Sequence, residues 1–167
     1  SALNAQGLNN LILVDDFNGN RQNRHLEAAQ FHQKVDRNEL MEWLTENGHE
    51  VSFVFHLGAR TDTTEFNFRV LDALNLSFSK QLWEVCATKQ IPLLYASSAA
   101  TYGDGSLGFS DAHAQIPFLK PLNPYGLSKH LFDLYVLEQS NCPPAWYGLK
   151  FFNVYGPNEY HKGRMAS

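Results

Sequence analysis

The sequence predicts an α/β fold in which helices cover both faces of a parallel sheet, a doubly wound arrangement. Short, nearly continuous apolar runs occupy residues 11–15, 51–57, 91–97 and 145–152. Runs of this length suit strands that are buried on both faces. Segments with helical periodicity lie between them, and such alternation favours parallel strands joined by helical crossovers. In this arrangement ligands bind beyond the carboxyl ends of the strands.

Each helix is predicted from its apolar spacing and its end signals. Residues 1–7 resemble the end of a helix that leads into the first run, and residues 38–47 form a helix that stops at Gly48. Residues 65–89 carry apolar side chains at spacings of three and four. A further helix opens near Tyr125, directly after Pro121-Leu122-Asn123-Pro124.

Composition excludes several classes of function. The chain has 167 residues, 44% hydrophobic, and a formal net charge of −4, so it lacks the basic footprint of a nucleic-acid-binding protein. Its apolar runs are far shorter than the roughly 20 residues of a membrane helix, and its first residues do not resemble a secretory signal. Cys86 and Cys142 lack metal-ligand spacing. We expect no bound metal, reduced thiols and a cytoplasmic location.

Three residues carry most of the chemical information. Tyr125 and Lys129 are four residues apart, so a helix places them on one face, and Ser98 follows a predicted strand. A tyrosine has an ordinary pKa of about 10, and a neighbouring ammonium lowers this value so that the phenol can exchange protons near neutral pH. A serine hydroxyl aimed at the same point holds a substrate oxygen. The trio therefore predicts proton transfer coupled to hydride transfer.

The order of these motifs resembles the extended short-chain dehydrogenase/reductase family, whose fold is Rossmann-like. S-S-A-A-T-Y-G at residues 97–103 precedes P-L-N-P-Y-G-L-S-K at 121–129, and F-F-N-V-Y-G-P-N-E follows at 151–159. The resemblance implies that Tyr125 is the acid/base, that Lys129 lowers its pKa and binds the nicotinamide ribose, and that Ser98 holds the reacting oxygen.

Within this family the sequence is most similar to the heptose epimerases, because H-K-G-R-M-A-S at residues 161–167 fits their H-K-G-x-M-A-S pattern. Ala99-Ala100 stands where dehydratase relatives place an acidic pair. The resemblance implies inversion at C6 of an ADP-activated heptose, from the D-glycero to the L-glycero form, by oxidation and re-reduction, in lipopolysaccharide inner-core synthesis. It assigns a second proton donor to Lys162 and implies a homopentamer.

The resemblance also implies the cofactor and substrate contacts. Asp15 ends a predicted strand, where a carboxylate ordinarily binds the adenosine ribose of NAD. The heptose epimerases mostly use NADP, for which Arg21 or Arg37 supplies a guanidinium; we predict NADP, with NAD as the alternative. The other implied cofactor contacts are Asp16, Leu57, Gly58, Ala59, Arg60, Thr61, Asn75, Lys129, Val154 and Lys162. The implied substrate contacts are Ser98, Asn153 and Arg164.

We expect residues 1–167 to be an interior part of a longer Rossmann-like domain. The glycine-rich turn and the first strand of such a domain are not in the sequence, and neither is a C-terminal substrate portion. The chain by itself is therefore expected to be deficient in activity. Two alternatives stay open: another nucleotide-sugar epimerase or reductase of the same family, and a non-catalytic fragment.

Overall fold

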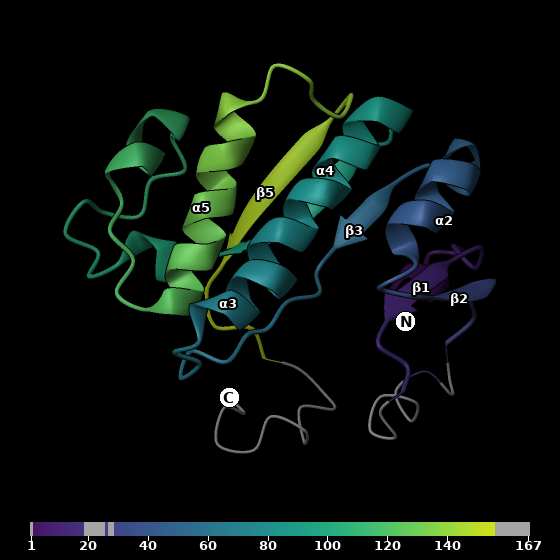
Figure 1. Ribbon diagram of the computed structural model, residues 1–167, viewed down its shortest axis with the longest axis horizontal. Helices are drawn as coiled ribbons and strands as arrows, with labels where there is room; N and C mark the ends of the chain where they lie inside the picture. Colours follow the sequence, from purple (N-terminus) through teal and green to yellow (C-terminus); the bar gives the residue numbers. More distant parts are fainter. Residues whose placement is uncertain (1, 19–25, 27–28, 156–167) are drawn as a thin grey trace. The chain divides into compact units, whose positions relative to one another are not determined.

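The structure is a computed structural model that describes residues 2–18, 26 and 29–155. It consists of two compact units (Figure 1). The first unit is Ser1–Glu46 with Asn153–Ser167, and the second unit is Asn47–Phe152. Parallel strands and helices occur throughout, which confirms the predicted α/β class.

The first unit contains a two-stranded parallel sheet. Strand β1, Ile12–Asp15, pairs with strand β2, Gln33–Asp36, and the register places Asp15 opposite Asp36. Helix α1 spans Ala2–Ala5, and helix α2 spans Leu40–Asn47. Strand β2 was not predicted, because Gln33 and Lys34 are exposed and only Val35 is buried. Its sequence therefore has no apolar run.

The second unit contains a three-stranded parallel sheet in the order β3-β4-β5. The strands are β3, Val54–His56; β4, Leu93–Ser98; and β5, Trp146–Phe151. The helices are α3, Phe68–Leu71; the π-helical η3, Asp72–Ser77; α4, Phe78–Lys89; and α5, Pro124–Glu138. The 3₁₀ segments are η2, Gly48–Glu50; η4, Ala99–Tyr102; and η5, His113–Phe118.

The core of the second unit lies between this sheet and its helices, which cover one face of the strands in Figure 1. Leu93 and Tyr95 point from β4 into this core, where the Tyr95 ring meets Phe132 of α5 edge to face at 4.9 Å. Trp146 of β5 meets the buried Trp83 of α4 in the same way at 5.5 Å. Such contacts stabilise by apolar burial and by ring geometry.

The opposite face of this sheet carries apolar side chains that remain exposed in the structure: Phe55, Leu57, Tyr147, Leu149 and Phe151. The sequence predicted helices on both faces of the sheet. Among the described elements of the second unit, helices lie on one face only.

The long helix predicted over residues 65–89 is interrupted. It begins at Phe68, because the Asn67 side chain accepts a hydrogen bond from the Arg69 amide and caps it. It then passes through the π-helical turn η3 before α4 begins. A π-helical turn inserts an extra residue and changes which side chains face inward. This turn carries Asn75, which is 1% exposed.

Neither a helix able to span a membrane nor a metal-binding cluster occurs in the part of the chain that the structure describes. None of its helices has the length and hydropathy that crossing a bilayer requires. The described residues also contain no group of three or more side chains arranged to hold a metal ion.

Candidate active site

Ser98 is the last residue of β4, and backbone geometry fixes its side chain. Its hydroxyl oxygen accepts a hydrogen bond from the Ala100 amide at 3.2 Å and so caps the 3₁₀ segment η4. The Thr101 hydroxyl donates to the Ser98 carbonyl at 2.7 Å. Ser98 is thus held at the carboxyl end of a central strand, where the fold predicts ligand binding.

Tyr125 lies in the first turn of α5, and two local signals explain why this helix begins where it does. The Asn123 side chain accepts a hydrogen bond from the Gly126 amide at 2.7 Å, and Pro124 occupies the first helical position. Gly126 also permits a close approach, because a Cβ there would lie 2.7 Å from the Ala100 carbonyl oxygen. The absence of that Cβ lets the start of α5 pack against η4, next to Ser98.

The electrostatics of Tyr125 differ from the prediction. Burial raises the pKa of Tyr125, and a hydrogen bond with Ser98 opposes that rise. The sequence predicted that Lys129 would lower this pKa. Lys129 is one helical turn away, and its ammonium donates to the Ala96 carbonyl of β4 at 2.8 Å. The protonated phenol is therefore the favoured form of Tyr125 in this structure.

Lys129 is itself strongly affected by its surroundings. It is 4% exposed, and burial lowers its pKa to about 8, although the nearby Asp133 carboxylate opposes this change. Burial, with a contribution from the Lys129 charge, also lowers the pKa of His56 to about 3. His56 is therefore neutral, and its Nε2 lies 2.8 Å from the Ser79 hydroxyl.

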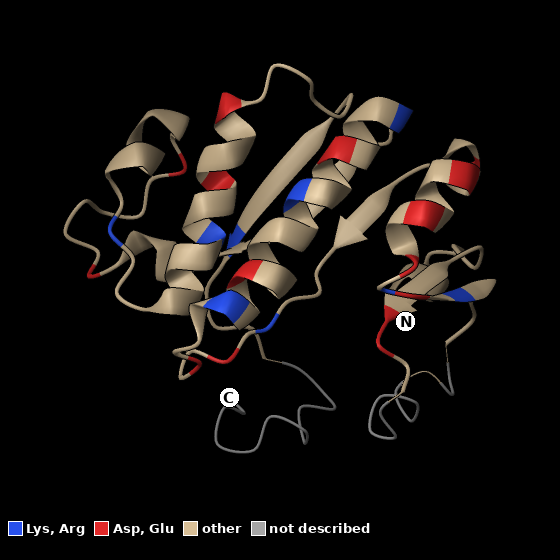
Figure 2. Ribbon diagram, in the orientation of Figure 1, with Lys and Arg blue, Asp and Glu red and all other residues tan. Residues whose placement is uncertain are grey.

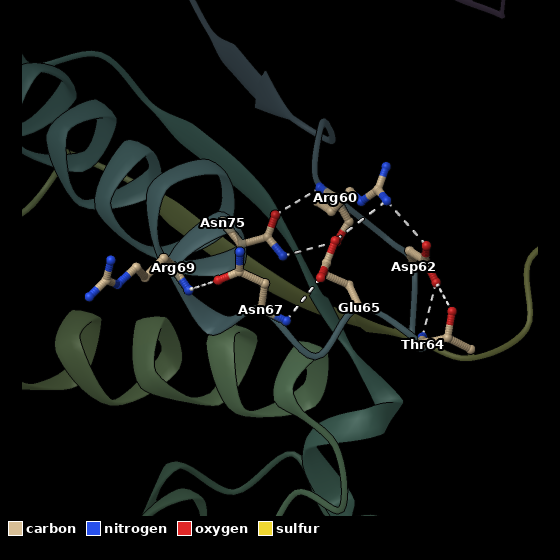
Figure 3. Close-up of polar contacts among 7 residues, drawn as sticks. All are labelled: Arg60, Asp62, Thr64, Glu65, Asn67, Arg69 and Asn75. Atoms are coloured by element: carbon tan, nitrogen blue, oxygen red, sulfur yellow. Dashed lines mark hydrogen bonds and ion pairs between the residues drawn. The ribbon is translucent and has the colours of Figure 1, made fainter.

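Asn75 connects the loop after β3 to the catalytic helix. Its side-chain oxygen accepts from the Arg60 amide at 2.8 Å, and its side-chain nitrogen donates to the Arg60 carbonyl at 3.0 Å (Figure 3). The same nitrogen donates to the Ser128 hydroxyl at 3.1 Å, and this hydroxyl donates to the Tyr125 carbonyl at 2.7 Å. Asn75 therefore positions backbone on both sides of the site. Its predicted direct contact with the cofactor stays a prediction.

The loop after β3 is held by its own charges as well. The Arg60 guanidinium pairs with Asp62 at 3.2 Å and with Glu65 at 3.6 Å (Figure 3). Leu57, Gly58 and Thr61 are exposed and Ala59 is partly exposed, and a Cβ on Gly58 would meet nothing within 4 Å. Open space therefore lies beside this backbone, as a bound dinucleotide requires.

A second cluster of predicted residues forms in the first unit. Asp15 and Asp16 lie at the carboxyl end of β1, where the Arg37 amide donates to the Asp15 carbonyl at 3.1 Å. The Arg37 guanidinium pairs with the Asp16 carboxylate at 3.5 Å. A guanidinium and hydroxyl-binding carboxylates are the groups that an adenosine ribose and its phosphate need, so these residues fit a nicotinamide dinucleotide.

The remaining predicted residues divide into two groups. Asn153 and Val154 follow β5 and are exposed. Arg21, Lys162 and Arg164 lie outside the described residues. The roles predicted for these five residues stay predictions.

Sequence reasoning missed a buried ion pair beside the trio. The Lys150 ammonium of β5 contacts the Asp133 carboxylate of α5 at 2.5 Å, and the Ser97 hydroxyl donates to the same carboxylate oxygen at 2.7 Å. Each charged residue interrupts an apolar run, Asp133 within 131–137 and Lys150 within 149–152. Charged residues are rarely buried unless they are paired, so these interruptions were the available signal.

Comparisons with known proteins place this geometry in a family. The model of the NAD dependent epimerase/dehydratase family matches residues 1–167. The ADP-L-glycero-D-manno-heptose-6-epimerase of Fusobacterium nucleatum is 44% identical over 169 residues, which cover 99% of this chain and 51% of that protein. The enzyme of the same name from Nitratidesulfovibrio vulgaris is 42% identical, with coverage of 99% and 51%. The chain spans about half the length of the curated relatives it matches.

Solved structures of epimerases also resemble this chain. The crystal structure of the Helicobacter pylori ADP-L-glycero-D-manno-heptose-6-epimerase superposes with a TM-score of 0.76 and 27% identity, over 98% of this chain and 52% of that one. The Thermus thermophilus UDP-glucose 4-epimerase, solved in complex with NAD, has a TM-score of 0.70 at 23% identity, over 94% of this chain and 51% of that one, and shows the same fold. The chain belongs to the NAD dependent epimerase/dehydratase family.

Proposed function

We propose that the intact protein carrying this chain is an epimerase that inverts C6 of ADP-D-glycero-D-manno-heptose, in lipopolysaccharide inner-core synthesis. The observation that carries this proposal is the close packing of the start of α5 against η4, which brings Tyr125 next to Ser98, together with the Lys129 ammonium anchored to the Ala96 carbonyl one turn further along α5. Relatives at 42% and 44% identity bear the name of the heptose epimerase, which supports this sugar over others.

The protein side of the reaction follows from this geometry. Ser98 holds the C6 oxygen of the sugar, and Tyr125 exchanges the proton of that oxygen. A nicotinamide, with its ribose bound by Lys129, would supply the acceptance of a hydride from C6 and its return. Burial raises the pKa of Tyr125, so the resting side chain is a phenol and carries the proton that the sugar oxygen takes up when the ketone is reduced. The opposite step needs the tyrosinate, and we propose that the Lys129 ammonium favours it against the effect of burial. Lys162 as the second proton donor stays a prediction.

We propose NADP as the cofactor, with Arg37 binding the adenosine 2′-phosphate and Asp15 binding the ribose. Arg37 supports this choice, because it lies at the carboxyl edge of the first-unit sheet and its side chain is 36% exposed. Asp16 opposes it, because its carboxylate pairs with the same guanidinium. NAD therefore remains the alternative. The cytoplasmic location and the homopentameric assembly stay predictions.

The test uses the intact protein with ADP-D-glycero-D-manno-heptose and follows the configuration at C6 by proton NMR. We expect conversion to the L-glycero epimer, and we expect Ser98→Ala and Lys129→Met to lower its rate. Conversion of UDP-hexoses without action on the heptose would replace this proposal with the first alternative. A cofactor-loaded protein that acts on none of these sugars would favour the non-catalytic alternative.

A further inference from the structure

The buried charges around the catalytic lysine form one connected group. Lys129 and Asp133 are one helical turn apart on α5, so both face β4, and their side chains lie on the same face of the helix as Tyr125. Figure 2 shows the charged positions of α5 as blue and red bands on an otherwise tan helix. Both residues are buried, Lys129 at 4% exposure and Asp133 at 2%.

Asp133 joins α5 directly to two strands, and through Lys150 to η4. Its Oδ2 accepts from Ser97 of β4 at 2.7 Å and from Lys150 of β5 at 2.5 Å. The Lys150 ammonium also donates to the Thr101 hydroxyl of η4 at 2.7 Å, and Thr101 donates to the Ser98 carbonyl. A continuous set of hydrogen bonds therefore runs from Asp133 to the backbone of the catalytic serine.

Among the described residues, Asp133 is the one carboxylate with an electrostatic effect on Lys129. The other titratable groups around the Lys129–Asp133 pair are His56 on β3, Tyr95 on β4, Tyr102 on η4, Lys150 on β5, and Tyr125 and His130 on α5. Burial lowers the pKa of both histidines and raises the pKa of all three tyrosines, so these five groups are neutral at neutral pH. One carboxylate, that of Asp133, is thus surrounded by two largely buried ammonium groups, those of Lys129 and Lys150.

We propose that Asp133 is a positioning residue for the reaction: its carboxylate balances the charge of the Lys129 ammonium and, through Ser97 and Lys150, holds α5 against the strands. We expect Lys150 to have the opposite electrostatic effect on Lys129, because its ammonium is a second cation in this group and pairs directly with Asp133. Its presence limits how strongly Asp133 stabilises the Lys129 charge. The effect of this charge balance on catalysis rests on the proposed function. The charge balance among Lys129, Asp133 and Lys150 does not depend on that function.

Substitutions of Asp133 and of Lys150 are therefore expected to shift the titration of Lys129 in opposite directions. Asp133→Asn removes the negative charge, so Lys129 should release its proton at a lower pH than the wild type does. Lys150→Met removes a repelling positive charge, so Lys129 should release its proton at a higher pH. Lys150→Arg keeps the charge and should leave the titration of Lys129 unchanged. A purely structural role predicts lost stability for Asp133→Asn and Lys150→Met without opposite shifts.

The titration of Lys129 can be measured in the intact protein by ¹³C and ¹⁵N NMR of the lysine side chains. The Lys129 signal is identified by its absence in Lys129→Arg. Glu84→Gln is the matched control, because it removes a carboxylate that accepts from Tyr135 of the same helix at 3.0 Å but lies on the exposed surface. We expect this control to leave Lys129 unchanged.

The alkaline limb of the pH profile of kcat/KM is the second measurement. We expect it to move with the Lys129 midpoint, so that each pH unit of downward shift in Asp133→Asn lowers the rate above that midpoint about tenfold. Opposite shifts of the Lys129 midpoint in Asp133→Asn and Lys150→Met support the proposal. Shifts in the same direction, or no shift, overturn it. If Asp133→Asn does not fold, the comparison of Lys150→Met with Lys150→Arg decides.

The NMR measurement needs neither substrate nor cofactor, so failure of the proposed function is distinguishable. A protein that shows the opposite shifts but does not convert the heptose would refute the function and leave the charge balance intact. A protein that converts the heptose without these shifts would refute the role of Asp133 alone.

Discussion

The two units use the same kinds of charged residue in opposite environments. In the second unit the side chains of Lys150 and Asp133 are 12% and 3% exposed, and they contact at 2.5 Å. In the first unit the side chains of Arg37 and Asp16 are 36% and 41% exposed, and they pair at 3.5 Å. An exposed pair contributes about 0–1 kcal/mol because solvent screens it, whereas breaking a buried pair costs about 3–5 kcal/mol because it strands a charge.

This difference in burial indicates that the charged residues of the two units have different roles. In the second unit the buried side chains of His56, Tyr125 and Lys129 have shifted pKa values, as groups that exchange protons often do. Exposed charges in the first unit suit reversible recognition of a charged cofactor. Substitutions in the second unit should therefore have large effects on rate and stability, and substitutions in the first unit should have small effects on affinity.

The largest effect is expected for Tyr125→Phe. Removing the phenol hydroxyl removes the acid/base group, and such groups contribute about 10²- to 10⁴-fold to rate. We expect kcat for heptose epimerisation to fall within that range while cofactor affinity, measured by calorimetry, stays unchanged. Tyr135→Phe on the outer side of the same helix is the control. A Tyr125→Phe enzyme with undiminished turnover would remove this residue from the mechanism.

Acid should destabilise the second unit through His56. The folded-state pKa of His56 is about 3, below its ordinary 6.5, so the unfolded chain binds the proton first as the pH falls. Stability present above pH 6.5 is therefore lost progressively between pH 6.5 and 3, by at most about 1.4 kcal/mol for each pH unit. Urea unfolding across this range should show a shallower loss for His56→Gln than for the wild type.

The control for this measurement is His49→Gln, because the His49 side chain is 74% exposed. It should show the same acid dependence as the wild type. Equal slopes for His56→Gln and the wild type would mean that the buried histidine does not govern acid stability.

Gly126→Ala should disturb the contact between α5 and η4. The new Cβ would lie 2.7 Å from the Ala100 carbonyl oxygen, so backbone must move. Overpacking of this kind costs about 1–3 kcal/mol, and we expect a lower midpoint in urea together with slower turnover. Gly58→Ala meets nothing within 4 Å and should leave stability unchanged. Its expected effect is weaker cofactor binding, and equal stabilities of the two variants would contradict this packing argument.

The smallest effect is expected in the first unit. Asp16→Asn releases Arg37 from its ion pair, and exposed pairs are worth up to about 1 kcal/mol. We therefore expect NADP to bind about two- to fivefold more tightly, with little change for NAD, by calorimetry. Glu50→Gln removes the carboxylate of the exposed pair of Glu50 with His49 in the second unit and serves as the control. Unchanged or weaker NADP binding by Asp16→Asn would argue against Arg37 as the 2′-phosphate contact.

Sequence reasoning predicted those parts of the fold that leave a local signal. Buried strands leave apolar runs: β1, β3 and β5 lie within the predicted runs, and β4 extends one residue beyond its run, to Ser98. The Ser98, Tyr125 and Lys129 motifs lie at a strand end and on one helix face, as their spacing required. Strand β2 left no such signal, because only Val35 of its side chains is buried.

Other features depended on tertiary contacts that a linear pattern does not contain. The π-helical turn at η3 turns Asn75 inward, towards Arg60 and Ser128, which lie 15 and 53 residues away. The pairing of Asp133 with Lys150 requires α5 to pack on β5. The pKa of Tyr125 was predicted with the wrong sign, because the prediction considered the nearby cation and neglected burial.

The most direct test of the account follows the hydrogen on C6 of the sugar. ADP-D-glycero-D-manno-heptose carrying deuterium at C6 is incubated with the intact, cofactor-loaded protein in ordinary water, and the product is analysed by NMR and mass spectrometry. Oxidation and re-reduction through Ser98, Tyr125 and Lys129 predicts an inverted C6 that retains its deuterium. Inversion with loss of deuterium to water would contradict hydride transfer and return.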